Sequence, residues 1–432
     1  MGLIEILVLV LSFLILLAIG VPVAWTLGIA SLLTILFSLE SLTAFMTMAQ
    51  QVMTSLDSFT LLAIPFFILA GQLMNKGGIA TRLINFAKNI VGALPGGLAH
   101  INVVAAMLFG AIAGSSVAAA SAIGSILGPR MEKEGYTKEF GAAINISSST
   151  MGLIIPPSNI LIVYSLASGG TSIAALFIAG YIPGILTGLI LMGVAAVWAM
   201  RKNFPVGERT ALKPLIKSFL KALPSLLLLV IVIGGIVIGI FTATEAAAIA
   251  VVYTLGLAFF YKEIRFKDLP SVLMGSVQTT SIVMILIATS ISMSWVMSFG
   301  HLPQSISETL LALSDNKIVI LLIINLILLF VGMFMDITPA VLIFTPIFLP
   351  VVVELGIDPV HFGIIMIMNL CIGICTPPVG TLLFVGVSVA GTTIEKVIKP
   401  LLPLFVAMLL TLILVTFWED LSLALPRLFD LM

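Results

Sequence analysis

Apolar residues occur along this chain in long runs that no charge interrupts. Positions 140–200 contain no Asp, Glu, Lys or Arg, and neither do positions 89–129. About 20 apolar residues are enough for a helix to cross a bilayer, so each run is long enough for more than one pass. This pattern predicts an all-α polytopic membrane protein and contradicts the short alternating strands of an outer-membrane barrel. Charges and turn residues separate twelve apolar segments, near residues 3–19, 23–39, 59–75, 97–128, 140–170, 172–200, 224–241, 244–261, 272–299, 318–352, 359–389 and 400–418.

The composition agrees with this prediction. Of the 432 residues, 60% are hydrophobic and 9% are charged, which excludes a water-soluble protein. The 19 Lys and Arg balance the 19 Asp and Glu, so the total charge does not indicate nucleic-acid binding. Cys371 and Cys375 lie inside an apolar segment, so we expect no disulfide framework.

The two halves of the chain resemble each other at a shift of 221 or 222 residues. A repeat of this size with interrupted hydrophobic segments at corresponding positions is typical of a secondary transporter. We therefore expect a first repeat in residues 1–200, a cytoplasmic linker at 201–222 and a second repeat in residues 223–432. The matched positions are Gly78 and Gly300, Gly110 and Gly332, Ser116 and Thr338, Gly152 and Gly373, Pro156-Pro157 and Pro377-Pro378, and Gly170-Thr171 and Gly391-Thr392.

The positions of the basic residues test the topology, because cytoplasmic loops collect Lys and Arg. We assume that residues 97–128 and 318–352 form re-entrant hairpins and that the N-terminus lies outside. The inside loops then contain 17 of the 19 basic residues, whereas counting both segments as single crossings divides them 13 to 6. The hairpin arrangement predicts about ten spanning helices, two hairpins and a second half that is inverted relative to the first.

Each half contains a Pro-Pro pair, at 156–157 and at 377–378, within a segment that otherwise reads as helix (140–170 and 359–389). Proline has no N–H, so these pairs leave four carbonyl oxygens without their helical partners, those of Gly152, Leu153, Gly373 and Ile374. Backbone breaks inside a membrane persist only where protein, water or an ion completes the bonding, and hard cations such as sodium prefer oxygen ligands. The alternative is a pair of proline kinks that neighbouring helices satisfy. Hydroxyls and amides flank the breaks at Ser158, Asn159, Thr376 and Thr381.

The tips of the two expected hairpins lie at residues 110–116 and 332–339. Ser115 or Ser116 can cap the helix that follows the first tip, and Thr338 can cap the second with Pro339 at the first helical position. A helix N-terminus inside the membrane attracts anions, so we expect an anionic substrate between the tips. The alternative is that the small residues only allow close helix packing. Asp336 is the one acidic residue deep in an apolar segment, and such carboxylates are functional by default, although it could simply cap the helix.

Signals of other chemistry are missing from the sequence. His100, His301 and His361 show no metal-ligand spacing, and no phosphate-binding Gly-rich loop with a Lys-Ser or Lys-Thr end is present. We therefore expect a transporter that does not use ATP directly, and no enzyme.

Four motifs in this order resemble the large, M-type membrane subunit of tripartite ATP-independent periplasmic (TRAP) transporters. The resemblance covers essentially the whole chain. It implies an elevator-type permease of the bacterial inner membrane that imports an organic carboxylate, such as a dicarboxylate or a sialic acid, on a sodium gradient. The motifs are Gly110-x-x-x-Gly-Ser-Ser-Val-Ala-Ala-Ala, Ile154-Ile-Pro-Pro-Ser158, Phe241-Thr-Ala-Thr-Glu-Ala-Ala247 and Cys375-Thr-Pro-Pro-Val-Gly-Thr381.

The resemblance also implies partners and a site. The partners are a separate small four-helix membrane subunit and a periplasmic substrate-binding protein. A stand-alone carboxylate carrier and a passive channel are the alternatives. The expected substrate-binding residues are Ser115, Ser116, Ser158, Asn159, Asp336, Thr338 and Thr381. The expected sodium-binding residues are Ser115, Ser116, Gly152, Leu153, Pro156, Gly332, Thr338, Gly373, Ile374, Thr376 and Pro377.

Overall fold

The computed structural model describes residues 3–76, 78–202, 204, 211–314 and 316–432, and within these ranges every regular element is a helix. The first half contains α1 (Leu3–Ala18), α2 (Val23–Ser38), α3 (Ser41–Leu56), η1 (Phe59–Leu62), α4 (Ala63–Lys76), α5 (Ile79–Val91), α6 (Gly97–Ala113), α7 (Ser116–Lys133), α8 (Lys138–Ser149), α9 (Met151–Ile154), α10 (Asn159–Ala167), α11 (Ile173–Ala179) and α12 (Tyr181–Lys202). The second half contains α13 (Leu212–Val237), α14 (Ala243–Phe260), η2 (Phe266–Asp268), α15 (Leu269–Phe299), α16 (Leu302–Leu313), α17 (Lys317–Phe334), α18 (Ile337–Glu354), α19 (Pro359–Gly373), α20 (Thr381–Ala390), α21 (Ile394–Phe417) and α22 (Asp420–Leu428).

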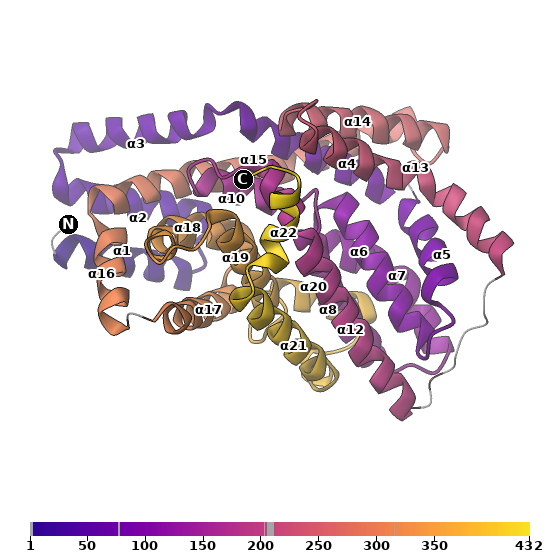
Figure 1. Ribbon diagram of the computed structural model, residues 1–432. Coiled ribbons are helices and arrows are strands. Elements are labelled where there is room, and N and C mark those ends of the chain that lie inside the picture. Colours follow the sequence, from indigo (N-terminus) through magenta and orange to yellow (C-terminus); the bar gives the residue numbers. More distant parts are fainter. Residues whose placement is uncertain (1–2, 77, 203, 205–210, 315) are drawn as a thin grey trace.

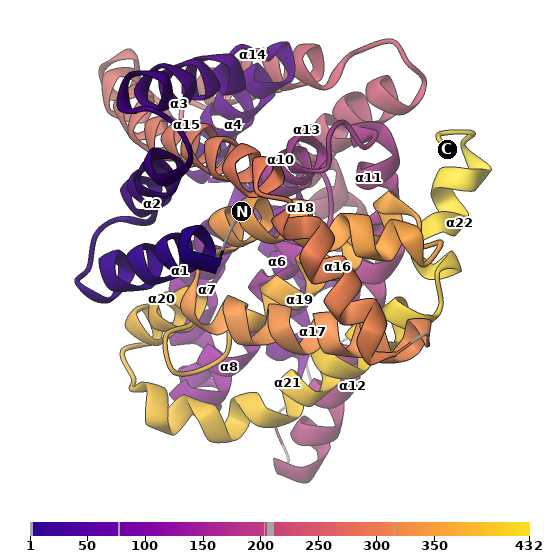
Figure 2. The ribbon, with the colours of Figure 1, turned by 90° about the vertical axis from the view of Figure 1, so that its left-hand side faces the viewer.

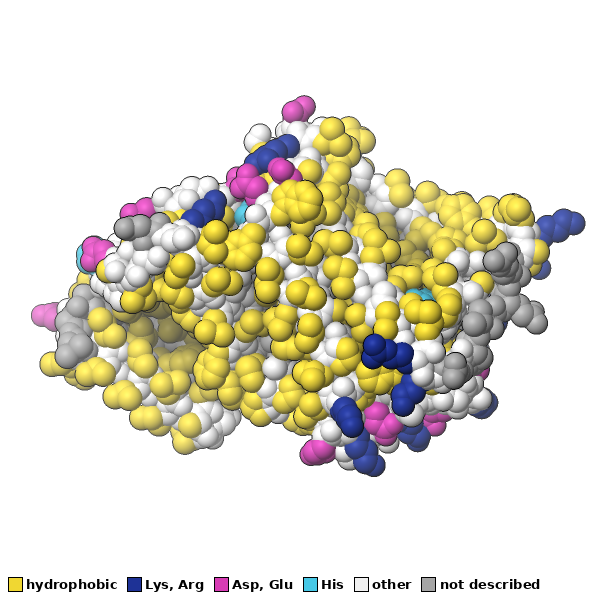
Figure 3. All heavy atoms as spheres, turned by 60° about the horizontal axis from the view of Figure 1, so that its bottom comes forward, with side chains coloured by type: hydrophobic (Ala, Val, Ile, Leu, Met, Phe, Trp, Pro, Cys, Tyr) yellow, Lys and Arg dark blue, Asp and Glu magenta, His cyan; other side chains and the backbone are white. Residues whose placement is uncertain are grey.

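The prediction of a helical membrane protein is confirmed. Among the described residues, eight helices are long and apolar enough to cross a membrane, or nine when the bent pair Lys138–Ile154 and Asn159–Ala167 counts as one span. Hydrophobic side chains cover most of the face in Figure 3, and the charged side chains gather in groups near its edges. Such a surface suits a surrounding bilayer, because lipid tails are as apolar as these side chains and can contact them without a hydration penalty.

The helices form two groups. An outer group consists of α1–α4, α14 and α15, in which α4 packs on α14 and α15, and α2 and α3 pack on α15. A core group consists of α6–α12 and α17–α22 and contains the two expected hairpins and the two broken helices. Figure 2 shows the outer group along one side of the molecule, and Figure 1 shows α5 and α13 at one end.

The linker expected at residues 201–222 lies only partly within the described ranges. Residues 203 and 205–210 lie outside the described ranges, whereas α12 continues to Lys202 and α13 already begins at Leu212. The basic residues of the second part of the predicted linker therefore lie on a helix. The division into residues 1–200 and 223–432 stays a prediction.

The glycines that correspond in the predicted repeat make the same kind of contact in each half. Gly110 of α6 lies directly against the backbone of Gly152, and Gly332 of α17 lies in the same way against Gly373. In each half only a hydrogen atom separates the hairpin from the broken helix, because a Cβ at Gly152 or at Gly373 would fall 2.6 Å from the opposite Cα. The two close approaches hold each hairpin against the break of its own half.

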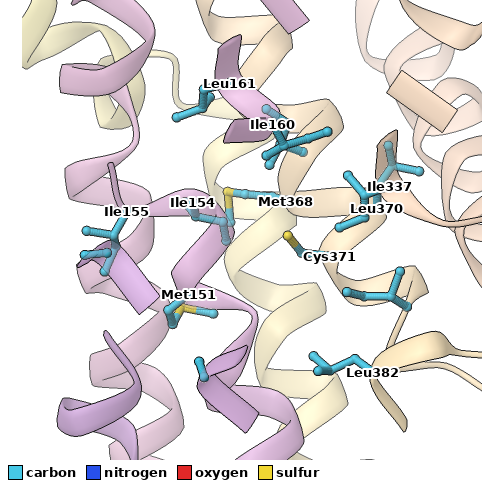
Figure 4. Close-up of a cluster of buried hydrophobic side chains, with 14 of the residues drawn as sticks. Met151, Ile154, Ile155, Ile160, Leu161, Ile337, Met368, Leu370, Cys371 and Leu382 are labelled. Atoms are coloured by element: carbon cyan, nitrogen blue, oxygen red, sulfur yellow. The ribbon is translucent and has the colours of Figure 1, made fainter. Parts of the chain in front are cut away.

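The broken helices meet at the centre of the molecule. All of α19 except its first residue is buried. At a shift of 221 residues Thr150 corresponds to Cys371, and Cys371 Sγ lies 3.8 Å from the Thr150 carbonyl oxygen. Figure 4 shows Met151 and Ile154 of one broken helix and Met368 and Cys371 of the other in the same buried cluster. This contact joins two positions that the predicted repeat places in correspondence.

Candidate functional site

A cavity of about 270 Å³ lies where the two hairpin tips, the two breaks and the outer group meet. The tips contribute Ser115, Ser116, Asp336 and Thr338, and the breaks contribute Leu153, Asn159, Ile374 and Thr381. The outer group closes the cavity with Gln72 and Asn75 of α4 and Thr279 and Val283 of α15. The cavity therefore joins six segments that are up to about 300 positions apart in the sequence, which is how a helical membrane protein builds an interior binding site.

The first tip turns as the sequence predicts. Gly114 takes a left-handed conformation with φ of 59°, which ends α6, and the next residue is extended. Ser115 Oγ accepts a hydrogen bond from the Ala118 N–H at 3.3 Å, so this serine caps α7. Ser116 follows as the first residue of α7 and is 5% exposed. The positive end of the α7 dipole therefore faces the cavity.

The second tip differs from the prediction. Asp336 is the N-cap residue of α18 and Thr338 is the second residue of the helix, so the expectation that Thr338 caps it is wrong. The reason is that the chain is already helical at Ile337, which follows the extended backbone of Asp336. Asp336 and Thr381 line the same cavity, and the Asp336 side chain forms no capping hydrogen bond with α18. The second tip contacts the second break through the backbone, because the Gly380 N–H donates to the Met333 carbonyl at 3.2 Å.

Both predicted helix breaks are confirmed. After α9 the chain becomes extended at Ile155 and passes through the 156–157 pair before α10 begins, and the helices on the two sides of the break differ in direction by 51°. In the second half α19 ends at Gly373 and α20 starts at Thr381, after the 377–378 pair. Both Pro-Pro peptide bonds are cis.

Within the protein, three of the four freed carbonyls find hydrogen-bond partners other than the helical ones. The Ser158 hydroxyl donates to the Leu153 carbonyl at 2.7 Å. The Thr376 N–H donates to the Gly373 carbonyl at 2.8 Å, and the Leu382 N–H donates to that of Ile374 at 3.2 Å. The chain folds back after each break and brings these donors to the helix end. A carbonyl oxygen has two lone pairs, so each of the three can still accept a second bond or bind a cation.

Eight of the fifteen predicted site residues line the cavity: Ser115, Ser116, Leu153, Asn159, Asp336, Thr338, Ile374 and Thr381. The other seven lie in the breaks or the second hairpin without lining it: Gly152, Pro156, Ser158, Gly332, Gly373, Thr376 and Pro377. Several of these seven have structural partners. The three glycines make the close approaches described above, and the Thr376 hydroxyl donates to the Ile372 carbonyl at 2.8 Å.

Three polar residues of the cavity are missing from the prediction. Gln72, Asn75 and Thr279 come from helices that the sequence suggests only as membrane spans. The available signal was the pair of amides in the otherwise apolar segment 59–75. Polar side chains inside such segments face protein or a cavity more often than lipid.

The electrostatics of the cavity are those of a cation and anion site. Asp336 is the only ionisable residue among the described residues that line it, and no Lys, Arg or His does. Asn159 Oδ1 is buried without a hydrogen-bond partner among the described residues. The cavity therefore has a carboxylate, an amide oxygen and several hydroxyls for a hard cation, and two helix N-termini for an anion. Among the described residues no cluster of three or more His, Cys, Asp and Glu suits a transition metal.

Comparison with known proteins identifies the family. Residues 10–421 match the family described as the tripartite ATP-independent periplasmic transporter, DctM component. This chain belongs to the DctM family. It is similar to YgiK of Salmonella typhimurium, with 58% identity over 418 residues that cover 97% of this chain and 96% of YgiK. It is also similar to the C4-dicarboxylate TRAP transporter large permease protein DctM of Pseudomonas aeruginosa, with 44% identity over 93% of this chain and 94% of that one.

The fold of this DctM-family chain also resembles a solved structure, that of the YdaH transporter of Alcanivorax borkumensis. The TM-score is 0.66 at 14% identity, over 88% of this chain and 89% of YdaH. At this identity the likeness concerns the fold alone. The resemblance of the four sequence motifs to the large TRAP subunit is confirmed, and the chain is a multi-pass membrane permease component and no enzyme.

Proposed function

We propose that this chain is the large permease subunit of a TRAP importer that couples the entry of an organic acid to sodium. The observation that carries the proposal is the single cavity shared by both hairpin tips and both helix breaks. The relatives support an anionic substrate. The P. aeruginosa relative is named for C4-dicarboxylates, and 42% and 38% identical relatives from Oleidesulfovibrio alaskensis and Vibrio cholerae are named for isethionate and sialic acid. A carboxylate, such as a dicarboxylate or a sialic acid, is the substrate class we propose.

The negative charge of Asp336 gives sodium its role. Two unit charges 4 Å apart interact by about 4 kcal/mol at an effective dielectric constant of about 20. A carboxylate substrate beside Asp336 is therefore repelled unless a cation lies between them, and no basic residue among the described ones lines the cavity. Sodium bound by Asp336, the neighbouring hydroxyls and carbonyls such as those of Leu153 and Ile374 removes this repulsion and orders the tips. The substrate then binds at the N-termini of α7 and α18.

The two helix groups favour an elevator movement. The hairpins and breaks contact one another within the core group, and α4 and α15 of the outer group pack against α6, α10 and α18 from the other side of the cavity. We propose that the core group carries sodium and substrate past α4 and α15. The outer group remains in place with the membrane.

Partners and orientation complete the proposal. The O. alaskensis relative is a longer chain named DctMQ, of which the present chain covers 64%. We propose a separate small four-helix membrane subunit for this chain, and a periplasmic binding protein that delivers the substrate. We place the chain in the bacterial inner membrane with its N-terminus in the periplasm. In support, loops predicted to lie together in the cytoplasm do contact each other, since Arg82 pairs with Glu263 and the Lys76 ammonium donates to Ser271 at 2.6 Å.

Reconstitution in liposomes tests the coupling. The chain, its small subunit and a substrate-loaded binding protein are expected to accumulate a labelled dicarboxylate or sialic acid under an inward sodium gradient, and not under an equal potassium gradient. Equal uptake in potassium would refute sodium coupling. Uptake without the binding protein would favour a stand-alone carrier, and a flux that never saturates would indicate a channel.

Two substitutions test the site in the same liposomes. Ser116→Leu and Thr338→Leu place bulky apolar side chains in the cavity and are expected to abolish sodium-dependent uptake. Ser125→Leu is the matched control, because Ser125 is exposed on α7 and does not line the cavity. Unchanged uptake by both cavity variants would show that substrate and sodium bind elsewhere.

A further inference from the structure

A second, basic cavity of about 190 Å³ lies between α5 and α13. Its lining residues are Arg82, Asn85, Pro214, Lys217, Ser218 and Lys221, none of which lines the cavity proposed for substrate. Figure 1 shows α5 beside α13 at one end of the molecule, and the rings of Phe86 and Phe219 hold the two helices together with centroids 5.6 Å apart. The sites are therefore separate, and the proposed transport function leaves this one without a role.

Three cationic side chains line the cavity, and two of them, Lys217 and Lys221, have no counter-charge among the described residues. No Asp or Glu is among its described lining residues. The two lysines are four residues apart, so they project from the same face of α13. Like charges at this spacing on a helix repel each other weakly, and a bound anion would offset this repulsion.

Arg82 is held in place on the opposite wall. It forms an ion pair with Glu263, and its guanidinium carbon lies 3.6 Å from the centre of the Tyr261 ring. Its Nη1 atom is buried and has no hydrogen-bond partner among the described residues. Asn85 and Ser218 add hydrogen-bonding groups beside it. A fixed guanidinium with an unused donor, faced by two ammonium groups, is the arrangement that recognises phosphate.

The cavity lies at the depth of lipid headgroups. Helix α13 has 26 residues, about 39 Å at 1.5 Å per residue, whereas the hydrocarbon core is about 30 Å thick. Counted back from Val237, the core ends near Lys217, and the long side chain of Lys221 can reach the same level. Apolar side chains are exposed next to the cavity, with Leu220 57% and Ile90 50% exposed. A soluble anion gains nothing from exposed apolar side chains beside its site, whereas the acyl chains of a lipid can pack against them.

We propose that this cavity binds the phosphodiester headgroup of an anionic phospholipid. Basic pockets between membrane helices at the interface bind lipids of this class. The two phosphates of diphosphatidylglycerol suit two cationic walls, Arg82 on α5 and the lysine pair on α13. The lipid then joins α5, which leads into the first hairpin, to α13 at the surface of the membrane.

Native mass spectrometry of the purified full chain tests the proposal. The chain in detergent is titrated with diphosphatidylglycerol, with phosphatidylcholine of the same acyl chains and with inorganic phosphate. We expect the wild type to retain the anionic lipid in preference to phosphatidylcholine. Each basic side chain at the membrane surface contributes about 1 kcal/mol, or about fivefold in affinity, so the double variant Lys217→Gln with Lys221→Gln is expected to bind about 25-fold more weakly.

Two further variants control for net charge and for folding. The double variant Lys217→Arg with Lys221→Arg keeps the charges and should keep the lipid. Lys396→Gln with Lys399→Gln removes two exposed lysines from the start of α21 and should bind like the wild type. Equal losses in the two glutamine variants, or equal retention of phosphatidylcholine, would overturn the proposal. Displacement of the lipid by inorganic phosphate at concentrations similar to that of the lipid would identify a soluble anion as the ligand and would also overturn it.

Discussion

Gly110→Ala tests whether the close approach of hairpin and break positions the substrate site. A Cβ at Gly110 would lie 2.9 Å from the Gly152 nitrogen and closer still to its Cα, whereas ordinary contact begins at 3.4 Å. The two backbones must therefore separate by more than the 0.5 Å between these distances. At Gly332 the nearest atom to a new Cβ is 3.0 Å away, so Gly332→Ala needs a smaller shift. Overpacking of this kind typically costs about 1–3 kcal/mol.

The expected effects follow this order. Gly110→Ala should lower the thermal stability and the sodium-dependent uptake more than Gly332→Ala does. Uptake is affected because the tip at Ser115 follows Gly110 by five residues on the same hairpin. Gly128→Ala on α7 is the control, because no atom lies within 4 Å of its Cβ position. Alanine there should be neutral or slightly stabilising, since glycine costs about 1 kcal/mol in a helix interior. The measurements are melting temperature in detergent and initial uptake rate in liposomes, and a Gly110→Ala protein that matches Gly128→Ala in both would refute the reasoning.

Three other substitutions have defined outcomes. Asp336→Asn removes the carboxylate proposed to bind sodium, so the sodium concentration for half-maximal uptake should rise about 10-fold or more, and an unchanged sodium dependence would exclude that role. Burial raises the pKa of the Glu263 carboxyl although the Arg82 guanidinium opposes the shift, so Glu263 is protonated at higher pH in the folded protein than in the unfolded chain. The contribution of Glu263 to stability should therefore increase as the pH falls through the raised pKa. Melting temperatures measured from neutral to acidic pH should vary less in Glu263→Gln than in the wild type, and an identical pH profile would contradict the assignment. Tyr164→Phe deletes the hydrogen bond from the buried hydroxyl to the Pro359 carbonyl at 2.6 Å, so the free energy of unfolding should fall by about 1–2 kcal/mol in a denaturation experiment. An unchanged free energy of unfolding would indicate that water replaces the hydroxyl.

Much of the fold is readable from the sequence because proline, glycine and charge mark its interruptions. The hairpin expected at residues 97–128 is present as α6 and α7, and both Pro-Pro pairs end a helix. Amphipathic helices are not readable in this way, because a search for apolar runs passes over them. Helices α3 and α5 mix apolar and polar residues with a helical period and were not predicted. Helix α13 also begins earlier than expected, because its lysines can extend to water while the helix continues into the membrane.

The candidate site is readable only in part for a different reason. The sequence locates the tips and breaks, since each depends on local chain chemistry. It does not show the path of the chain after a break, so it could not reveal that Ser158 and Leu382 return to bond the carbonyls. Nor does it show that α4 turns Gln72 toward the hairpins. Both depend on tertiary packing between distant segments.

The contact between Thr150 and Cys371 determines how the protein can be divided. Buried residues of both halves belong to one hydrophobic cluster, so neither half has a core to itself. We therefore expect the two halves to fold as one cooperative unit. A fragment that stops after α12 would leave its broken helix facing lipid, whereas a chain nicked between α12 and α13 should reassemble from its two pieces.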